Sequence, residues 1–523
     1  MILPLSLVIS LAVYIASRKI LQLYHSVTTR SHRAQDTPRL YPHLDPLLGL
    51  DLAAQTWRDF RGGELSEGLR RRHALLGRTF LANSLGGDSI YTVEPDNIRA
   101  VTTTHFSSFG KAGWVAEAAK HVGNGVLMNE GEAWRRSRAM LKPVFARSAV
   151  DEPGFMEPHV ERLVAEMRRL SGEGGEVFDF HELACMFTLD IVTEFLFGRS
   201  TRCLEDPRGP EGREGMEFLA LVKKFEGPSG EFIAVGLLAW LQLLPSYIYL
   251  IGLVRGMKTW FSRKLDGIMA EPNTTPAPNS PRSVFTAMKA AGIPVDKIQG
   301  ELQNVFFASY DTTSAFLANF VYVLARYPDV QAKLRREIDS SLGGRHPTNH
   351  ALAKMEYLQL VIMEGPDGRG PIVVRAGATV VWSTYTLHRD PQRYGSDWAD
   401  FRPERWASLV RPRGTTPATD EGEGGSVGST ADASEIGGGR QGDDGGIWGE
   451  GCRWRSAFMP FGSGPRTCLG QQMVQVEVAY VVVRLLQELA HLDMECGGEM
   501  KPFREARAVS LYNADGVRIS VGC

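Results

Sequence analysis

The sequence reads FGSGPRTCLG from Phe461 to Gly470, which places one cysteine in a loop rich in glycine and proline. An apolar helical pattern, Gln472–Leu492, follows directly. The backbone N–H groups of such a loop and the positive end of the helix favour a thiolate over a thiol. A thiolate at Cys468 can bind a metal, and Arg466 could neutralise an anionic cofactor beside it. A free thiol in an ordinary turn is the alternative for a lone cysteine.

The composition of the whole chain is that of a folded protein. Its 523 residues are 43% hydrophobic and 23% charged, which excludes a disordered chain, and long uncharged runs are too few for a polytopic transporter. The formal net charge of −2 gives no basic excess for nucleic acid. The six cysteines contain no C-x-x-C pair, which indicates a reducing compartment.

Most of the chain has helical periodicity. Two clear patterns besides the one after Cys468 are Val160–Leu170 and Val330–Leu342. Runs of β-branched residues are few and short: Ile372–Val374, Thr379–Trp382 and Val517–Val521. The pattern predicts a mainly α fold with small β-sheets.

A segment of very different composition interrupts this pattern. Eleven of the thirty residues from Glu421 to Glu450 are glycine, and acidic residues far outnumber the lone Arg440. Such a segment buries too little apolar surface to offset the entropy of ordering it. We therefore expect a disordered surface insert at about 413–450.

The first residues predict a membrane anchor. Met1–Ser17 carries no charge, and Arg18 and Lys19 follow at once. Positive charge after the apolar run favours a signal anchor over residues 1–24, with the rest of the chain in the cytosol. A cleaved signal peptide, the alternative, would carry its charge in front. Residues 25–46, with three prolines, predict a stiff linker to a catalytic domain at 47–523.

A second uncharged stretch, Phe232–Val254, is long enough to span a bilayer. Pro245, Ser246 and two tyrosines interrupt it, and tyrosine favours the bilayer interface. An element that dips into one leaflet is the favoured interpretation. A buried core helix is the alternative.

The cysteine loop resembles the haem-binding loop of the cytochrome P450 family, F-x-x-G-x-R-x-C-x-G, at every fixed position. The resemblance implies the cytochrome P450 fold after the anchor helix. It also implies haem b, with Cys468 as the axial ligand whose electron donation favours O–O cleavage. On the same resemblance, the loop residues expected to bind the cofactor are Phe461, Gly464, Arg466 and Gly470.

Two further motifs of the family occur in the expected order. Trp134 and Arg138 match W-x-x-x-R, and the resemblance implies that both contact the haem propionates from one face of a helix. The stretch Ala308–Thr313 resembles A-G-x-D/E-T-T, with Ser309 in place of the glycine. In the family this helix lies over the haem, and the resemblance implies that Ala308 contacts the cofactor. The acid–alcohol pair of the motif delivers protons to bound oxygen. Here that pair is Asp311 and Thr312.

One family motif is incomplete. Phe401–Trp406 matches F-x-P-E-R-[FW], and the family's arginine, here Arg405, pairs with the Glu and Arg of an E-x-x-R helix. Glu364 occupies the glutamate position, but position 367 is Asp, and Gly365-Pro366 breaks the helix. We infer that a segment is missing between residues 364 and 365. A catalytically impaired haem protein, or one without haem, is therefore an alternative to an active enzyme.

The stretches Thr188–Gly198, Gly365–Ile372 and Tyr385–Gly395 resemble the fungal alkane and fatty-acid hydroxylase branch most. The resemblance implies a monooxygenase that hydroxylates a long-chain alkane or fatty acid near its terminus, with O2 as oxidant. A secondary-metabolite hydroxylase on the same scaffold is the runner-up. A haem-thiolate isomerase or dehydratase would need no external electrons, and Asp311 and Thr312 argue against it.

The resemblance also implies partners and a location. An NADPH-dependent flavin reductase would supply electrons, membrane lipid would hold the lipophilic substrate, and the protein would lie in the endoplasmic reticulum membrane. Nucleic acid is not expected as a partner. The basic residues expected at the reductase-docking face are Arg135, Arg136, Lys142, Arg453 and Arg455.

Overall fold

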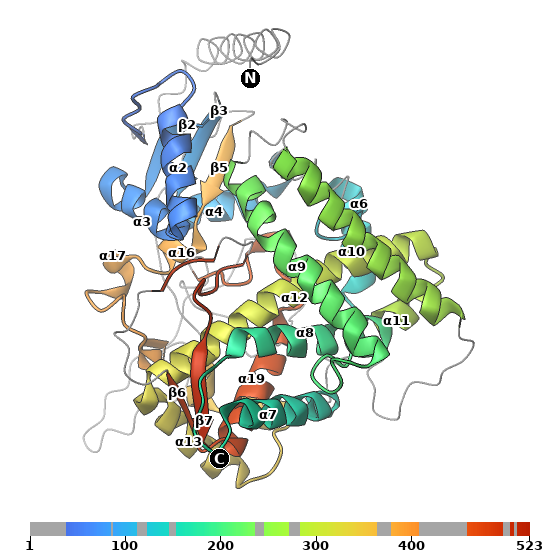
Figure 1. The fold of residues 1–523 in the computed structure, drawn as a ribbon. Coiled ribbons are helices and arrows are strands. Elements are labelled where there is room, and N and C mark those ends of the chain that lie inside the picture. The colour runs from blue at the N-terminus through green and yellow to red at the C-terminus, as the bar shows by residue number, and fades with distance from the viewer. Residues whose placement is uncertain are drawn as a thin grey trace, which may run out of the picture.

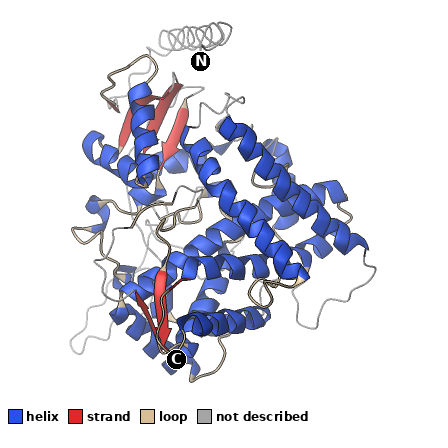
Figure 2. Cartoon of the chain, in the orientation of Figure 1, coloured by secondary structure: helices blue, strands red, loops and turns tan. Residues whose placement is uncertain are grey.

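The computed structural model describes residues 38–84, 87–111, 123–145, 153–235, 245–270, 283–362, 378–406, 458–494, 503–506 and 510–522. The described part is mainly helical and carries two small sheets (Figure 2). Its helices are α2 (Leu50–Gly62), α3 (Leu65–Leu76), α4 (Pro95–Arg99), α6 (Gly131–Leu141), α7 (Glu157–Ser171), α8 (Phe180–Phe197), α9 (Pro210–Val235), α10 (Pro245–Ala270), α11 (Val284–Ala290), α12 (Val295–Arg326), α13 (Pro328–Leu342), α14 (Asn349–Lys354), α15 (Glu356–Ile362), α16 (Thr384–Leu387), α17 (Pro391–Tyr394) and α19 (Gln471–Glu488). Its strands are β1 (Arg39–Leu40), β2 (Thr79–Ser84), β3 (Gly87–Thr92), β4 (Phe178–Asp179), β5 (Thr379–Trp382), β6 (His491–Met494) and β7 (Arg518–Gly522). This agrees with the mainly α fold with small β-sheets expected from the sequence.

Helix α12 runs through the middle of the molecule and packs against α8 (Figure 1). It has 32 residues and no internal proline. Pro294 precedes its first turn, where a missing N–H costs nothing, and Pro328 begins the next helix immediately after it. Most of the side chains of α12 are buried, so the helix forms the central support on which other elements are placed.

The two sheets lie at opposite ends of the molecule (Figure 1). The four-stranded sheet has the order β1-β2-β3-β5, and β2 pairs antiparallel with β3 with Phe80 opposite Tyr91. The rings of this cross-strand pair stack at 4.9 Å between centroids. The three-stranded sheet has the order β4-β7-β6, with both pairs antiparallel.

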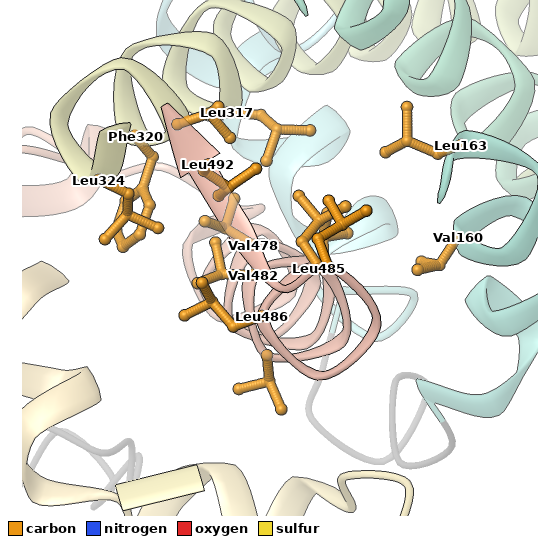
Figure 3. Packing of buried hydrophobic residues seen from close by; sticks show 14 of the residues in the cluster. Val160, Leu163, Leu317, Phe320, Leu324, Val478, Val482, Leu485, Leu486 and Leu492 are labelled. Carbon is orange, nitrogen blue, oxygen red and sulfur yellow. The ribbon is translucent and has the colours of Figure 1, made fainter. Parts of the chain in front are cut away.

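Two apolar cores surround α12. In the first, shown in Figure 3, one face of α19 packs against α12, α7 and β6. Its labelled members are Val160, Leu163, Leu317, Phe320, Leu324, Val478, Val482, Leu485, Leu486 and Leu492. The second core joins α8, α9, α10 and α12 around four buried aromatic side chains, Phe218, Trp260, Phe261 and Phe306. Helix α12 is therefore held on two sides.

Most of the elements expected from periodicity are found, with one correction. The patterns at 160–170 and 330–342 lie in α7 and α13, the run 379–382 is β5, and 517–521 overlaps β7. The helix expected to reach Leu492 ends at Glu488 instead, because Leu489 adopts an extended conformation. The residues after it form β6 and pair with β7, so a tertiary partner overrides a helical apolar pattern that has no glycine or proline to end it.

The apolar stretch Phe232–Val254 is divided between the end of α9 and the start of α10, and residues 236–244 lie outside the described residues. In α10, Leu250, Leu253 and Val254 are buried, whereas Ile248 is 60% exposed and Tyr249 is 51% exposed. None of the helices in the described ranges is long and apolar enough to cross a membrane. The anchor expected at 1–24 and the insert expected at 413–450 lie outside the described residues.

Candidate active site

The cysteine loop closes on itself through backbone hydrogen bonds. The Cys468 N–H donates to the Phe461 carbonyl at 2.9 Å, so the cysteine returns to the start of the motif. Between them, Gly464–Arg466 forms a 3₁₀ turn. The N–H and the hydroxyl of Thr467 donate to the Gly464 carbonyl at 3.0 and 2.7 Å. Cys468 is thereby fixed three residues before α19 begins.

Gly464 lets this loop approach the segment Ala100–Thr104. Its φ of +68° lies in the left-handed region, and a Cβ atom there would lie only 2.0 Å from the Thr102 carbonyl oxygen. The hydroxyls of Thr102 and Ser463 are 2.8 Å apart, which fixes the same contact. The glycine of the motif therefore docks the loop on another part of the chain.

Trp134 and Arg138 both contact the residues that precede Cys468. The Arg138 guanidinium donates to the Thr467 carbonyl at 2.8 Å. The Arg466 guanidinium stacks over the buried Trp134 ring at 4.6 Å and donates to the Asn129 carbonyl at 3.1 Å. The structure thus brings the W-x-x-x-R pair on α6 and the loop arginine together, and the propionate contacts expected of the pair stay a prediction.

The cations beside the loop are well placed to bind an anion. Burial lowers the pKa of both Arg138 and Arg466. Burial also lowers the pKa of Lys111 to about 8, and the charge of Arg466 adds to this effect. Among the described residues, no carboxylate lies within ion-pair distance of either guanidinium. A desolvated cation without a carboxylate is costly, so this donor set fits the carboxylates of a haem.

Two opposing effects act on the pKa of the Cys468 thiol. Its side chain is accessible to solvent, yet the surrounding protein desolvates the thiolate and raises the thiol pKa. The N–H groups of Gly470 and Gln471 and the charge of Arg138 act in the other direction. The loop and helix N–H groups therefore act in the direction expected from the sequence, and burial opposes them.

The middle of α12 has one open face. Ala308 and Thr312, one turn apart, are exposed, whereas most of their neighbours in the helix are buried. The Thr312 hydroxyl donates to the Ala308 carbonyl at 2.6 Å, so its oxygen can still accept a hydrogen bond from the open side. Ser309, in the position of the motif's glycine, donates to the Val305 carbonyl at 2.7 Å and adds no side chain to this face.

Asp311 faces a different element from its neighbour Thr312. Its carboxylate accepts a hydrogen bond from the hydroxyl of Ser510, in the C-terminal segment. Burial raises the pKa of the Asp311 carboxyl, and the Ser510 hydroxyl and N–H oppose that rise. The acid and the alcohol of the motif are therefore adjacent in sequence, but they are held by different parts of the molecule.

The second apolar core links the cysteine loop to this part of α12. Leu469, which follows Cys468, and Met473 of α19 pack in the same cluster as Phe306 and Tyr310 of α12. Phe145 belongs to the cluster too, and a Cβ at Gly470 would lie 4.0 Å from its ring. The cysteine loop and the central helix α12 therefore contribute side chains to the same apolar core.

Two residues of α12 that the sequence analysis missed position the segment before α6. The Glu301 carboxylate accepts from the Val126 N–H at 2.8 Å and from the Ser137 hydroxyl. Asn304 accepts from the Leu127 and Met128 N–H groups at 3.1 and 3.0 Å. The sequence signal is weak, because Glu301 and Asn304 lie three residues apart in a helix that carries several other polar residues.

Arg405 is buried and has several oxygen partners. Its guanidinium donates to the carbonyls of Tyr394, Asp397 and Asp400 at 3.2, 2.8 and 3.0 Å, and the Asp397 carboxylate lies 3.6 Å away. Glu364 and the junction after it lie outside the described residues. The bridge between Glu364 and Arg405 therefore stays a prediction.

The family model described as cytochrome P450 matches residues 52–365 and 434–513 of this chain. The chain belongs to the cytochrome P450 family. The first matched stretch of this P450 ends at Gly365, at the junction where we infer a missing segment, and the Arg405 motif lies between the two stretches.

Fungal P450s are among its relatives. The chain is 27% identical to cytochrome P450 monooxygenase himC of Aspergillus japonicus, over 92% of this chain and 82% of that protein. It is 29% identical to cytochrome P450 monooxygenase FPY7 of Fusarium mangiferae, over 92% and 88%. It is 31% identical to cytochrome P450 52A5 of Candida maltosa, over 82% and 80%. This P450 is thus a member of a monooxygenase family.

Proposed function

We propose that this P450 hydroxylates a long-chain alkane or fatty acid near its terminus, as a haem-thiolate monooxygenase. The observation that carries the proposal is the convergence of a solvent-accessible Cys468 on a closed loop with two desolvated cations, Arg466 of the loop and Arg138 of α6. The similarity to cytochrome P450 52A5 and the sequence stretches noted above support the substrate class.

The residues around the loop have separate tasks in this proposal. Arg138, Arg466 and Trp134 hold the propionates, and Cys468 ligates the iron. Haem bound there supplies the activation of O2, with the thiolate as the electron donor that favours O–O cleavage. Arg138 also donates to the Thr467 carbonyl at 2.8 Å, so one side chain would hold both a propionate and the loop that carries Cys468.

In this proposal, Asp311 and Thr312 of α12 supply protons to the open face of the helix. Asp311 keeps a proton more readily than an exposed aspartate, since burial raises its pKa. Thr312 presents a hydroxyl oxygen on the open face of the helix, next to Ala308. Asp311 precedes Thr312 in the helix, and an acid with a raised pKa next to such a hydroxyl in sequence is suited to supplying protons to that face.

A flavin reductase is the proposed source of electrons from NADPH. Arg135 and Arg136 on α6 and Lys142 after it are exposed on the element that contacts the cysteine loop. Arg453 and Arg455 lie outside the described residues. An acidic reductase would be steered to such a surface, at rates that fall as ionic strength rises.

We further propose attachment to the endoplasmic reticulum membrane through residues 1–24, with a second contact at the start of α10. The exposed Ile248 and Tyr249 and the exposed Leu44 and Leu47 support it; in Figure 1, the start of α10 and the segment before α2 lie at the same end of the molecule.

Deletion of residues 1–30 should therefore weaken membrane binding without abolishing it, measured by flotation with lipid vesicles. Ile248→Ser together with Tyr249→Ser in the truncated protein should release the remainder. Complete release by the truncation alone would contradict the second contact.

The central experiment is the spectrum of the reduced, CO-bound protein. We expect the Soret band of a thiolate-ligated haem, and its loss in Cys468→Ser, because an alcohol is a poor ligand for this iron. The matched control is Cys185→Ser, which should keep the band. An unchanged spectrum in Cys468→Ser would refute the ligand. Turnover of a fatty acid that needs neither NADPH nor a reductase would instead indicate an isomerase or dehydratase.

A further inference from the structure

The C-terminal segment joins the acid of α12 to a second acid on α9. The Ser510 hydroxyl donates to the Asp311 carboxylate, and the Tyr512 hydroxyl donates to Glu226 Oε2 at 2.7 Å. Ser510 and Tyr512 are two residues apart, a spacing that places side chains on the same side of an extended chain. The segment is also fixed to α12 by Asn319, whose amide donates to the Leu511 carbonyl at 2.7 Å.

The two carboxyls share a desolvated environment. Burial raises the pKa of Glu226, and the negative charge of Asp311 raises it further, while the Tyr512 hydroxyl and Lys223 oppose the rise. Burial likewise raises the pKa of the Asp311 carboxyl. A negative charge on either carboxyl disfavours ionisation of the other, so the two groups titrate as a coupled pair.

The other titratable groups that face Glu226 come from two elements. On α8, desolvation raises the pKa of the half-buried Cys185 thiol to about 12, and the His181 ring stacks on Tyr512 at 4.3 Å. On α12, burial raises the pKa of Tyr310. Burial lowers the pKa of His181, so this imidazole is neutral near pH 7. Lys223, on α9 itself, is the cation whose charge lowers the pKa of Glu226.

The helix that carries Glu226 also carries an exposed ion pair. Lys223, one turn earlier on α9, is exposed and pairs with the exposed Glu182 of α8 at 3.1 Å. Glu226 itself is half-buried. Glu226 is thus one helical turn from a solvated ion pair and is joined through Tyr512 to the segment that holds Asp311, a position suited to exchanging protons with water.

We propose that Glu226 is the proton-storing partner of Asp311, and that the two carboxyls act as one acid pair. The inference rests on the proposed function, because the pair would resupply the protons that the proposed reaction consumes at the open face of α12, where the Thr312 oxygen can accept a hydrogen bond. Glu226 gives up its proton, the Asp311 carboxylate accepts it, and Glu226 takes a replacement from water on the Lys223 side. Ser510 and Tyr512 are positioning residues that hold each carboxyl in place.

The pair can be tested without turnover, by infrared difference spectroscopy of the protonated carboxyl band during a pH titration. Glu226→Gln should remove one such band, whereas the control Glu64→Gln, at an exposed ion pair, should leave the bands unchanged. Asp311→Asn removes a negative charge and should lower the midpoint of the Glu226 band by about one unit. Tyr512→Phe removes a donor to the carboxylate and should raise it. A Glu226 midpoint that ignores Asp311→Asn would overturn the proposal.

A second measurement uses the haem-loaded enzyme. Glu226→Gln should lower the share of consumed NADPH that appears as hydroxylated product, raise the solvent isotope effect and leave the CO-bound spectrum unchanged. Glu226→Asp should restore part of the coupling. Unchanged coupling in Glu226→Gln would count against proton storage. A wild-type protein without a haem spectrum would refute the proposed function, and the infrared titration would still decide whether the acid pair exists.

Discussion

At the scale of single residues, the cysteine loop contains two glycines with nearly the same backbone conformation and different surroundings. Gly462 has a φ of +72° and no atom near the position of a Cβ. Gly464 has a φ of +68° and the Thr102 carbonyl oxygen 2.0 Å from that position. Backbone strain and close contact can therefore be separated within one loop.

Gly464→Ala should destabilise the protein more than Gly462→Ala. Both substitutions impose a left-handed conformation on a residue with a Cβ, at a cost of about 1–2 kcal/mol. At Gly464 the Cβ also meets backbone atoms, and such overpacking adds about 1–3 kcal/mol. Urea unfolding measures the difference, and haem content per chain should fall only in Gly464→Ala. Equal losses in the two variants would show that the contact with Thr102 does not matter.

The residues of the site differ in how far the sequence could predict them. Trp134, Arg138, Arg466 and Cys468 lie in local motifs whose spacing fixes their geometry, and the structure brings them together. Ser510 and Glu301 act across long sequence separations, on Asp311 and on the segment before α6. No local pattern indicates such pairs, because they depend on which elements the fold brings side by side.

At the scale of elements, α3 carries a buried histidine that links stability to pH. His73 lies in the last turn of the helix, and its Nδ1 is 3.1 Å from the Gly77 carbonyl oxygen, which a neutral imidazole satisfies by donating. Burial is the main cause that lowers the His73 pKa from 6.5 to about 4. The unfolded chain therefore binds a proton in a range where the folded chain does not.

Stability should fall as the pH drops from about 6.5 towards about 4, by up to about 3 kcal/mol from this residue. Above pH 6.5 both states are neutral, and the contribution is constant. His73→Gln keeps a donor for Gly77 and should remove about 2 kcal/mol of the difference between pH 7.5 and pH 5, measured by urea unfolding. The control His105→Gln, at an exposed position, should leave it unchanged. The same pH dependence in both variants would contradict the assignment.

Helix ends show where sequence periodicity loses its power. The patterns within α7 and α13 were sufficient because each helix starts at or near a proline and ends at a glycine, Gly172 or Gly343. Helix α19 has no such stop signal, and its end is set by the pairing of β6 with β7. A strand partner supplied from a distant part of the chain is invisible to a local pattern.

At the scale of the whole molecule, we propose that the junction after Glu364 lowers the stability of the fold. The first stretch of the family match ends at Gly365, and the Arg405 guanidinium donates to the carbonyls of Tyr394, Asp397 and Asp400. Loss of one member of a buried charge network typically costs about 3–5 kcal/mol, a large part of the stability of most proteins.

We therefore expect the chain to load haem poorly and a family-like insert between Glu364 and Gly365 to restore loading and fatty-acid turnover. The insert should place an arginine three residues after Glu364, and the matched control carries methionine there. Rescue by the arginine insert alone would assign the defect to the missing cation. Equal haem content and turnover with and without either insert would show that the junction is harmless.

The order of strands in the three-stranded sheet has a consequence for synthesis on the ribosome. β7 lies between β4 and β6, and it follows β4 in the chain by more than three hundred residues. Until β7 emerges, β4 and β6 have no partner in this sheet, and unpaired strands are templates for aggregation. Such distant pairing is slow to form. The nascent protein should therefore depend on chaperones up to the synthesis of β7, and a nonsense mutation shortly before Arg518 should yield insoluble protein despite an intact cysteine loop.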